Sequence, residues 1–520
     1  MTMRSATILV VLLACAAQAA EERFYAELDV SRFREIATLD DGRKKPLDSL
    51  AREKVETVCG SQSIEGQDPV VTFLSMVFEP EKWLDNPVIQ VRDKGLAATI
   101  ELQRKGADGK TFVGRWISLK EWKRAEASGV LQTHYDELSK DTSKAGVEKR
   151  DRFRKAVEDV AGRAALLERM ADLFLPVPIG ADGKRPWVTL AEAGEASAVH
   201  GAELRKLDAL LRAGFAAHDP MMVNQALAGL TDLLPKVNPP IYATAARLSF
   251  ETFINTFRPL RWAMFIFFAA TIISLVQLGI GRHLWLPLLA AGAAIGLSLL
   301  WVVGRGVLAE RWPLGNIFEV MAMCSALVTL IGFVLSIVHR SGYFLAAGSF
   351  LSASILLIGE TMVPSEYRIL SPLVPVLRSY WMQYHVTCMA VAYAGSTLAF
   401  GVSVVYLVGY ACGKRAPGHL ALLETYIYRT VQVAFVFLTA GVMLGGLWAN
   451  ESWGRYWGWD PKEIWALICW LIYAVYLHGR MIGWCRGLTA AWACVAGFGA
   501  VFFTFYGVNF ILKGLHSYAN

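Results

Sequence analysis

Eight long apolar runs fill the second half of this chain. They lie near residues 260–280, 284–304, 317–338, 342–359, 385–411, 430–448, 462–482 and 488–512. A helix needs about twenty residues to cross a hydrocarbon core of about 30 Å. The pattern therefore predicts a mainly α fold, a polytopic bundle of about eight transmembrane helices over residues 260–520. A content of 54% hydrophobic and 12% aromatic residues agrees, because it exceeds that of an ordinary soluble protein.

The preceding residues 21–255 have the composition of a soluble domain, in which acidic and basic residues nearly balance. Alternation over 86–91 and 110–119 is typical of strands, and the apolar spacing over 147–174, 190–215 and 221–234 is typical of helices. We expect an α+β, mostly helical domain here, and Pro239-Pro240 breaks the pattern before the membrane part begins.

Residues 1–20 have the form of a secretory signal peptide. Arg4 precedes an apolar run over 6–17, and Ala17-Gln18-Ala19 matches a small-residue cleavage site. Cleavage there predicts export of the domain that follows. Two alternatives stay open, because Leu12-Leu13-Ala14-Cys15 also resembles a lipid-attachment box and the segment can remain as an uncleaved anchor.

Cysteine usage excludes two classes of protein. Cys59 is the only cysteine in the predicted exported domain, and no Cys-x-x-Cys occurs anywhere in the sequence. One cysteine forms no internal disulfide, and a chain without such a thiol pair is neither a thiol oxidoreductase nor a self-attached c-type haem protein.

Counting membrane crossings brings three distant segments to one face. The start of the fifth span at His385, the loop between the sixth and seventh spans, and the tail that carries His516 all emerge on the same side. Lys and Arg are spread too evenly over the loops to orient the chain. The signal alone therefore predicts that this face, with both ends of the mature chain, is extracytoplasmic.

The loop region 448–465 is dense in tryptophan. Trp453, Trp457 and Trp459 occupy seven residues together with two glycines. Tryptophan gathers at membrane interfaces in any case, but this density predicts a shelf for a large planar apolar ligand. The following Asp460-Pro461-Lys462-Glu463 has the pattern of a capped helix start, so its two carboxylates are expected to cap the seventh span rather than to catalyse.

Three histidines are candidate metal ligands. A lone histidine at a membrane interface is usually an amphipathic surface side chain. His385 and His516, however, share one predicted face, where they could approach a metal from two sides, as axial ligands of haem do. His478 lies roughly 26 Å along the seventh helix from Pro461. An ionisable group at that depth is a functional candidate, although its neighbour Arg480 also fits a plain interfacial position.

These residues carry a resemblance to a known family. Trp453-Gly454-x-x-Trp457-x-Trp459-Asp460-x-x-Glu463 is similar to the WWD signature of haem-handling membrane proteins, and its surroundings resemble the CcsA/ResC family of cytochrome c biogenesis. Further matching pieces lie at 311–319, 380–385, 476–478 and 507–518, so the resemblance covers essentially residues 260–520. More weakly, residues 41–47 resemble the exported segment that precedes this module in some bacterial versions.

The resemblance implies a system II holocytochrome c synthase, or haem lyase, which attaches haem b to the CxxCH motifs of apocytochrome c by thioether bonds. It assigns His385 and His516 as catalytic residues and axial iron ligands on the outer face, and His478 as the ligand that receives haem within the membrane. The implied haem-binding loop contains Trp453, Trp457, Trp459 and Asp460. The family's second intramembrane histidine has no convincing equivalent here, which implies a CcsB/ResB-like partner chain.

Several expectations about the surroundings follow from this assignment. The chain lacks a thiol pair, so a separate thiol-reducing protein is expected to keep the apocytochrome cysteines reduced. Haem propionates need cations, and Arg311, Arg378, Arg455 and Lys462 are the outer candidates. The expected location is the bacterial inner membrane, among its lipids, with the soluble domain and the C-terminus in the periplasm. No nucleic-acid partner is expected.

Two other functions fit the same residues. A haem exporter or chaperone would hand haem on without forming a bond. A b-type haem electron carrier ranks lower, because such carriers usually place ligand pairs on facing helices inside the bilayer, whereas His385 and His516 are predicted at helix ends. The soluble domain is expected to dock the apocytochrome or the partner subunit, or to act as a spacer over the membrane module.

Overall fold

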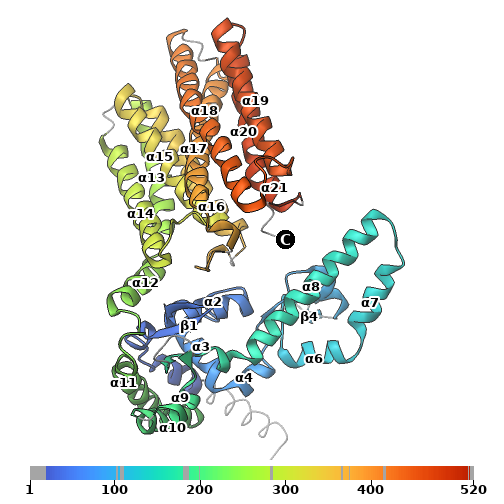
Figure 1. The fold of residues 1–520 in the computed structure, drawn as a ribbon, viewed down its shortest axis with the longest axis vertical. Helices are drawn as coiled ribbons and strands as arrows, with labels where there is room; N and C mark the ends of the chain where they lie inside the picture. Colours follow the sequence, from blue (N-terminus) through green and yellow to red (C-terminus); the bar gives the residue numbers. More distant parts are fainter. Residues whose placement is uncertain are drawn as a thin grey trace, which may run out of the picture. The chain divides into compact units, whose positions relative to one another are not determined.

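The computed structural model describes residues 19–100, 103–105, 111–179, 187–197, 199–280, 285–364, 367–373, 375–413, 417–512 and 514–515. Most of the predicted signal peptide (residues 1–18) and His516 therefore lie outside the described residues. The chain divides into two compact units, with the boundary between Thr256 and Phe257. Figure 1 shows the course of each unit.

The first unit is mostly helical, as the sequence predicts. Its helices are α2 (Leu47–Cys59), α3 (Pro69–Phe78), α4 (Pro80–Leu84), α5 (Lys94–Thr99), α6 (Leu119–Ala127), α7 (Val130–Ser139), α8 (Lys144–Glu168), α9 (Leu190–Ala196), α10 (Gly201–Ala217), α11 (Pro220–Val237) and α12 (Ala245–Phe257). The helix expected over 190–215 is in fact two helices, because the backbone at Ser197 turns to an extended conformation (φ −92°, ψ 112°).

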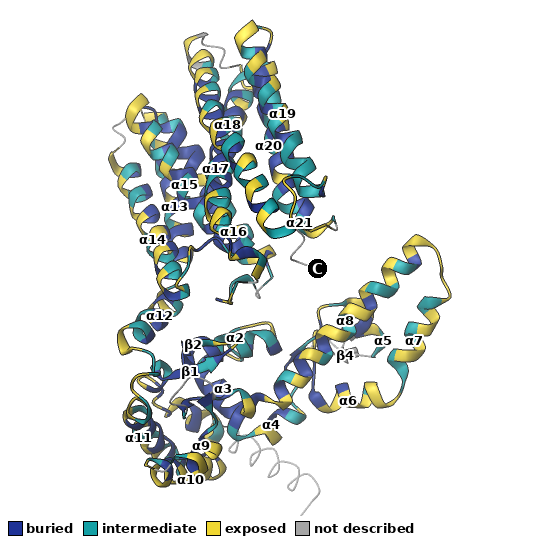
Figure 2. Cartoon of the chain, viewed as in Figure 1, coloured by how far each residue is buried: buried dark blue, intermediate teal, exposed yellow. Residues whose placement is uncertain are grey.

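Among its described residues, the first unit also contains four small antiparallel sheets. They pair β1 (Ala37–Asp40) with β2 (Arg43–Pro46), β3 (Ile89–Gln90) with β6 (Trp116–Ile117), β4 (Gln103–Lys105) with β5 (Thr111–Val113), and β7 (Val177–Pro178) with β8 (Trp187–Val188). Most of the core lies between the helices, and the strand residues Ile89, Ile117 and Val177 join it. Leu50 of α2, Phe73 of α3 and Phe215 of α10 are fully buried members of it, and Figure 2 shows the buried faces turned inward.

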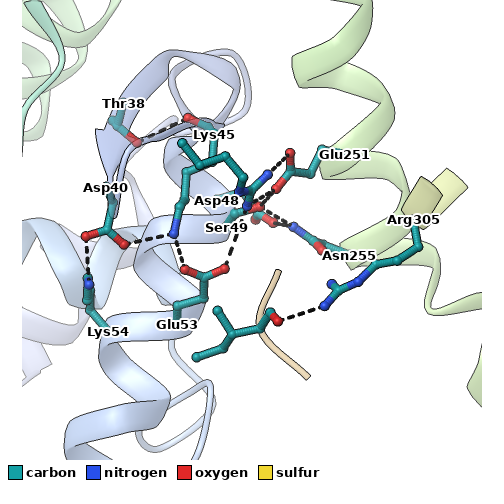
Figure 3. Close-up of polar contacts among 12 residues, drawn as sticks. Thr38, Asp40, Lys45, Asp48, Ser49, Glu53, Lys54, Glu251, Asn255 and Arg305 are labelled. Carbon is teal, nitrogen blue, oxygen red and sulfur yellow. Dashed lines mark hydrogen bonds and ion pairs between the residues drawn. The ribbon is translucent and has the colours of Figure 1, made fainter. Parts of the chain in front are cut away.

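A cluster of buried charges joins the β1–β2 hairpin to two helices. The Lys45 ammonium donates to Asp40 Oδ2 over 2.8 Å and to Glu53 of α2. The Arg43 guanidinium pairs with both carboxylate oxygens of Glu251 in α12, at 2.8 Å each. Figure 3 shows how these side chains converge. Buried charges are tolerated only when paired in this way, so the cluster fixes the hairpin against α2 and α12.

The second unit is a bundle of membrane-length helices. They are α13 (Pro259–Ile280), α14 (Trp285–Ala309), α15 (Ile317–His339), α16 (Gly342–Met362), α17 (Tyr380–Ala411), α18 (Pro417–Trp453), α19 (Pro461–Ile482) and α20 (Leu488–Phe502), which continues through a π-helical turn, Phe503–Gly507, into α21 (Val508–Phe510). Within the described ranges, eight helical segments are long and apolar enough to cross a membrane. The predicted polytopic bundle is thus confirmed.

Two of the helices extend beyond the apolar runs of the sequence. Helix α17 begins at Tyr380 rather than at His385, because the Ser379 hydroxyl caps it by accepting from Trp381 N over 3.2 Å. Helix α18 continues to Trp453. Only residues 454–460 connect it to α19, and we call this segment the tryptophan loop. His385 therefore lies in the second turn of its helix rather than at the start.

Helices α17 and α18 approach each other closely at three glycines. A Cβ added at Gly395 would lie 3.0 Å from Ala434, one at Gly441 would lie 2.6 Å from Met389 Sδ, and one at Gly445 would lie 2.8 Å from the His385 ring. Small residues at helix interfaces permit such close packing in membranes. The pair therefore holds the first turns of α17 against the last turns of α18.

Candidate functional site

A large cavity opens in the second unit where six elements end or begin near one another. Segments of α15, α17, α18, the tryptophan loop, α19 and the α20–α21 junction line it. Its empty space, counted out to the open mouth, is about 1370 Å³. Figure 1 shows α21 at the end of the bundle where α19 begins.

His385 lies in the wall of this cavity. Its Nδ1 is 2.7 Å from the carbonyl oxygen of Gly441 in α18. A carbonyl only accepts, so Nδ1 carries the proton, and in the neutral imidazole Nε2 is the unprotonated nitrogen. This tautomer is the one that ligates a metal, and a backbone carbonyl on the other nitrogen is the usual device that orients such a ligand.

The His385 ring packs against two residues of α18. It stacks on the indole of Trp448, with ring centroids 5.9 Å apart and planes 13° apart. Trp448 is itself fixed, because it is 2% exposed and its Nε1 donates to Val376 O over 3.0 Å. Gly445 also approaches the ring so closely that an added Cβ would lie 2.8 Å from it. The ring is therefore positioned before any ligand arrives.

The three tryptophans of the sequence motif occupy different positions. Trp457 lines the cavity. Trp453 lies against the buried Trp448, with ring centroids 4.9 Å apart. Trp459 is 67% exposed and meets Trp457 edge-on at 5.9 Å. Its φ of +57° is unusual for a bulky residue. The indoles of Trp448 and Trp457 thus contribute to the cavity wall, whereas Trp453 contacts Trp448 and Trp459 contacts Trp457.

Asp460 caps α19, as its sequence pattern predicts. Its carboxylate accepts from Lys462 N over 3.1 Å, and the Glu463 carboxylate accepts from Asp460 N over 3.1 Å, which completes the capping box. The second carboxylate oxygen of Asp460 accepts from Leu515 N over 2.6 Å. The same side chain therefore starts α19 and holds the C-terminal segment beside the tryptophan loop.

The structure does not bring the other two predicted histidine ligands into view at the cavity in the same way. His516 follows Leu515 directly in sequence but lies outside the described residues. His478 is exposed near the far end of α19. Within the part of the chain that the structure describes, no group of three His, Cys, Asp or Glu side chains gathers to hold a metal ion.

The four cations that are candidates for binding haem propionates have different surroundings in the structure. Arg311 donates to both carboxylate oxygens of Glu319, over 2.8 and 3.1 Å. Arg378 lines a smaller neighbouring pocket. Arg455 is exposed and packs over Gly458, where an added Cβ would lie 2.4 Å from its guanidinium carbon. Lys462 lines the large cavity, and its Nζ donates to Asn509 Oδ1 over 3.0 Å.

Several site residues were missed by the sequence analysis. Gly441 and Gly445 lie four residues apart in an apolar helix, which is a recognisable signal for close helix contact. The carbonyl of Gly441 binds His385 Nδ1, and the missing side chain of Gly445 allows the imidazole ring to approach α18. Glu319 stands three residues after Asn316, the spacing of an N-cap and N3 pair. In the structure Asn316 caps α15, while Glu319 is fully buried and also pairs with Arg305 over 3.0 Å.

Known proteins are similar to this chain in the region that contains the large cavity. A family model described as cytochrome C assembly protein matches residues 314–516. Every residue that lines the large cavity lies between 314 and 510, so the match contains the whole cavity. The first unit lies outside it.

Curated relatives extend this match. The cytochrome c biogenesis protein CcsA of Chlamydomonas reinhardtii is 35% identical over 248 residues, which are 46% of this chain and 69% of the relative. The chain belongs to the CcsA family. CcsA of Synechococcus elongatus is 33% identical over 285 residues, 44% of this chain and 87% of the relative. CcsA of Chlorella vulgaris is 30% identical over 295 residues, 49% of this chain and 93% of the relative.

Family membership confirms the resemblance read from the tryptophan motif. It places this CcsA-family chain in cytochrome c biogenesis, as a multi-pass membrane protein that takes part in cytochrome c maturation and haem handling.

Proposed function

We propose that this CcsA-family chain binds haem b in the large cavity and attaches it to apocytochrome c, as a holocytochrome c synthase that acts with a CcsB/ResB-like partner. The observation that carries the proposal is the setting of His385. It lies in the wall of the large cavity, and its Nδ1 proton is engaged by Gly441 O, which leaves Nε2 in the form that ligates iron.

The lining of the cavity fits a mainly apolar ligand with aromatic faces. Met382, Val386, Met389 and Phe505 line it together with the indoles of Trp448 and Trp457. Aromatic and thioether side chains favour contact with a porphyrin face or edge. This lining supports haem over a polar substrate.

His516 is proposed as the second axial ligand. Consecutive Cα atoms are about 3.8 Å apart, so His516 follows directly from Leu515, the residue whose amide Asp460 holds at the tryptophan loop. Asp460 therefore acts by anchoring the segment that delivers the ligand. This role also explains why the buried Asp460 carboxylate accepts hydrogen bonds from two backbone amides that are far apart in sequence.

The reaction proposed for this site is thioether formation. Two imidazoles saturate the iron until a CxxCH segment arrives, and the histidine of that segment replaces one of them. Each cysteine thiol then adds across a vinyl group: sulfur bonds to one vinyl carbon, and the other carbon receives a proton. Proximity and orientation supply much of the rate. The thiols must arrive reduced, which requires a separate thiol-reducing protein.

His478 is proposed to receive haem at the inner side together with a ligand from the partner chain. It is exposed on α19 rather than packed within its own bundle. An ionisable side chain on the outer face of a membrane helix is unfavourable unless another group meets it. Its exposure therefore supports a partner surface at this position. With the signal peptide taken as evidence for export, the large cavity faces the periplasm of a bacterial inner membrane.

A haem exporter or chaperone is the main alternative, because the same ligands would serve it. Purified protein with its partner, haem b and an apocytochrome peptide containing CxxCH separates the two functions. The synthase yields peptide-bound haem that survives acid-acetone extraction, whereas an exporter yields only extractable haem. A b-type electron carrier stays the weakest alternative, since His385 lies in the second turn of α17 rather than at mid-membrane.

A further inference from the structure

Lys462 is an unexpected residue for the wall of a cavity that otherwise suits an apolar ligand. Of the described residues that line the cavity, Lys462 and Glu463 are the ones with formal charge at neutral pH. Burying a charge is unfavourable unless an opposite charge or strong hydrogen bonds compensate it. The two side chains therefore need separate explanations.

The charge of Glu463 is compensated within the chain. Its carboxylate accepts from Gly458 N over 2.7 Å and from Asp460 N over 3.1 Å. Both donors belong to the tryptophan loop, so Glu463 shapes that loop and caps α19. It needs no further partner.

The charge of Lys462 is not compensated in the same way. Its Nζ donates to the neutral amide oxygen of Asn509 over 3.0 Å, and its ammonium has three N–H donors. In the described parts of the chain, it forms no ion pair with a carboxylate. Asn509 follows the π-helical turn 503–507, a kind of distortion often found at functional sites. Lys462 also occupies the second position of α19, where the helix dipole adds positive potential.

We infer that Lys462 binds a carboxylate of the ligand, namely a propionate of haem, and so orients the macrocycle in the cavity. This inference rests on the proposed function. The two propionates and the two vinyl groups lie on different edges of haem b, so fixing a propionate at Lys462 also sets where the reactive vinyl edge lies. Lys462 is thus a positioning residue, and the cavity selects porphyrins with free acid groups.

The test compares haem b with its dimethyl ester, in which both propionates are neutral. Each porphyrin is titrated into the purified full-length chain with its partner, and Kd is taken from the Soret absorption. Wild-type protein should bind haem b roughly ten to a hundred times more tightly than the ester, as expected for a charge-assisted hydrogen bond. Lys462→Gln and Lys462→Met should bind both porphyrins about equally.

Two further variants keep the test independent of folding. Lys462→Arg retains the charge and should retain the preference for haem b. Lys120→Gln removes an exposed lysine of the first unit, which pairs with Asp85, and should leave the preference unchanged. A general loss of affinity lowers binding of both porphyrins and leaves their ratio at the wild-type value. If Lys462→Gln keeps the wild-type ratio of the two affinities, the inference about Lys462 is overturned and the proposed haem site is not. Failure of wild-type protein to bind either porphyrin would overturn the proposed haem site and the inference with it.

Discussion

At the scale of single residues, Gly445 sets how closely α18 approaches His385. An added methyl group would lie 2.8 Å from both Cε1 and Nδ1 of the imidazole, so Gly445→Ala must displace the ring from Gly441 O. Overpacking of this kind costs about 1–3 kcal/mol, and we expect haem affinity to fall roughly five- to hundredfold. Absorption titration with haem b measures the change.

The control for this substitution is Gly499→Ala. A Cβ at Gly499 of α20 meets no atom within 4 Å, so this variant changes glycine to alanine in a membrane helix without crowding. Its haem affinity should equal that of the wild type. Equal affinities for Gly445→Ala and wild type would show that the position of the His385 ring does not matter for binding.

Asp40 gives the first unit a defined response to acid. Burial raises the pKa of Asp40, but the ammonium groups of Lys45 and Lys54, each 2.8 Å away, outweigh it and hold the pKa below its ordinary value. A lowered folded-state pKa stabilises the fold above the unfolded pKa of about 3.9, and this contribution is lost as pH falls through the folded pKa.

Replacing the Asp40 carboxylate should therefore lower the stability of the first unit at neutral pH, and lower it less in acid. We expect Asp40→Asn to lower the free energy of opening of residues 37–59 by about 3–5 kcal/mol at pH 7, because it removes the carboxylate that pairs with Lys54 and one of the two carboxylates that pair with the buried Lys45. Hydrogen exchange of the full chain, corrected for intrinsic pH dependence, measures it. A difference between variant and wild type that stays constant down to pH 2 would contradict the ion-pair explanation.

At the scale of elements, Asp460 joins the start of α19 to the C-terminal segment. Asp460→Ala removes a helix cap worth about 1 kcal/mol and also releases Leu515 N from its 2.6 Å bond. We expect faster hydrogen exchange over residues 508–515 and a loss of low-spin haem signal, because the segment that carries His516 is no longer held.

Asp219→Ala is the matched control for the cap. Asp219 precedes Pro220 at the start of α11 and accepts from Met221 N and Met222 N, so it has the same Asp-Pro cap without a tethered tail. It should weaken its own helix and leave the haem spectrum unchanged. An unaltered spectrum in Asp460→Ala would mean that the tail does not supply a ligand.

The elements of the second unit were predictable because each depends on a local signal. Eight apolar runs predicted eight spans, and Asp460-Pro461-Lys462-Glu463 predicted the first residue of α19. The ends of α17 and α18 were not predictable from hydropathy, because hydroxyl caps and polar end turns continue both helices past their apolar runs. Contacts between distant segments, such as Leu515 with Asp460, leave no local pattern at all.

At the scale of the whole molecule, the proposed contact with a partner chain rests on His478. It is exposed on α19, far from the cavity that contains His385. We expect His478→Ala to lower the haem content of the complex several-fold when cells supply the haem. The same variant should bind haem b added directly to the purified complex as the wild type does, because the large cavity is unchanged. Equal haem content in cells would contradict a receiving role for His478.

The central claim is that His385 and His516 hold one haem b beside the tryptophan loop. The most direct measurement is the reduced absorption spectrum of the purified chain with its partner, in wild type and in His385→Ala and His516→Ala. The account predicts a low-spin, bis-histidine spectrum that either substitution alters, with cytochrome c maturation lost in parallel. Full haem content with an unchanged spectrum in both variants would contradict it.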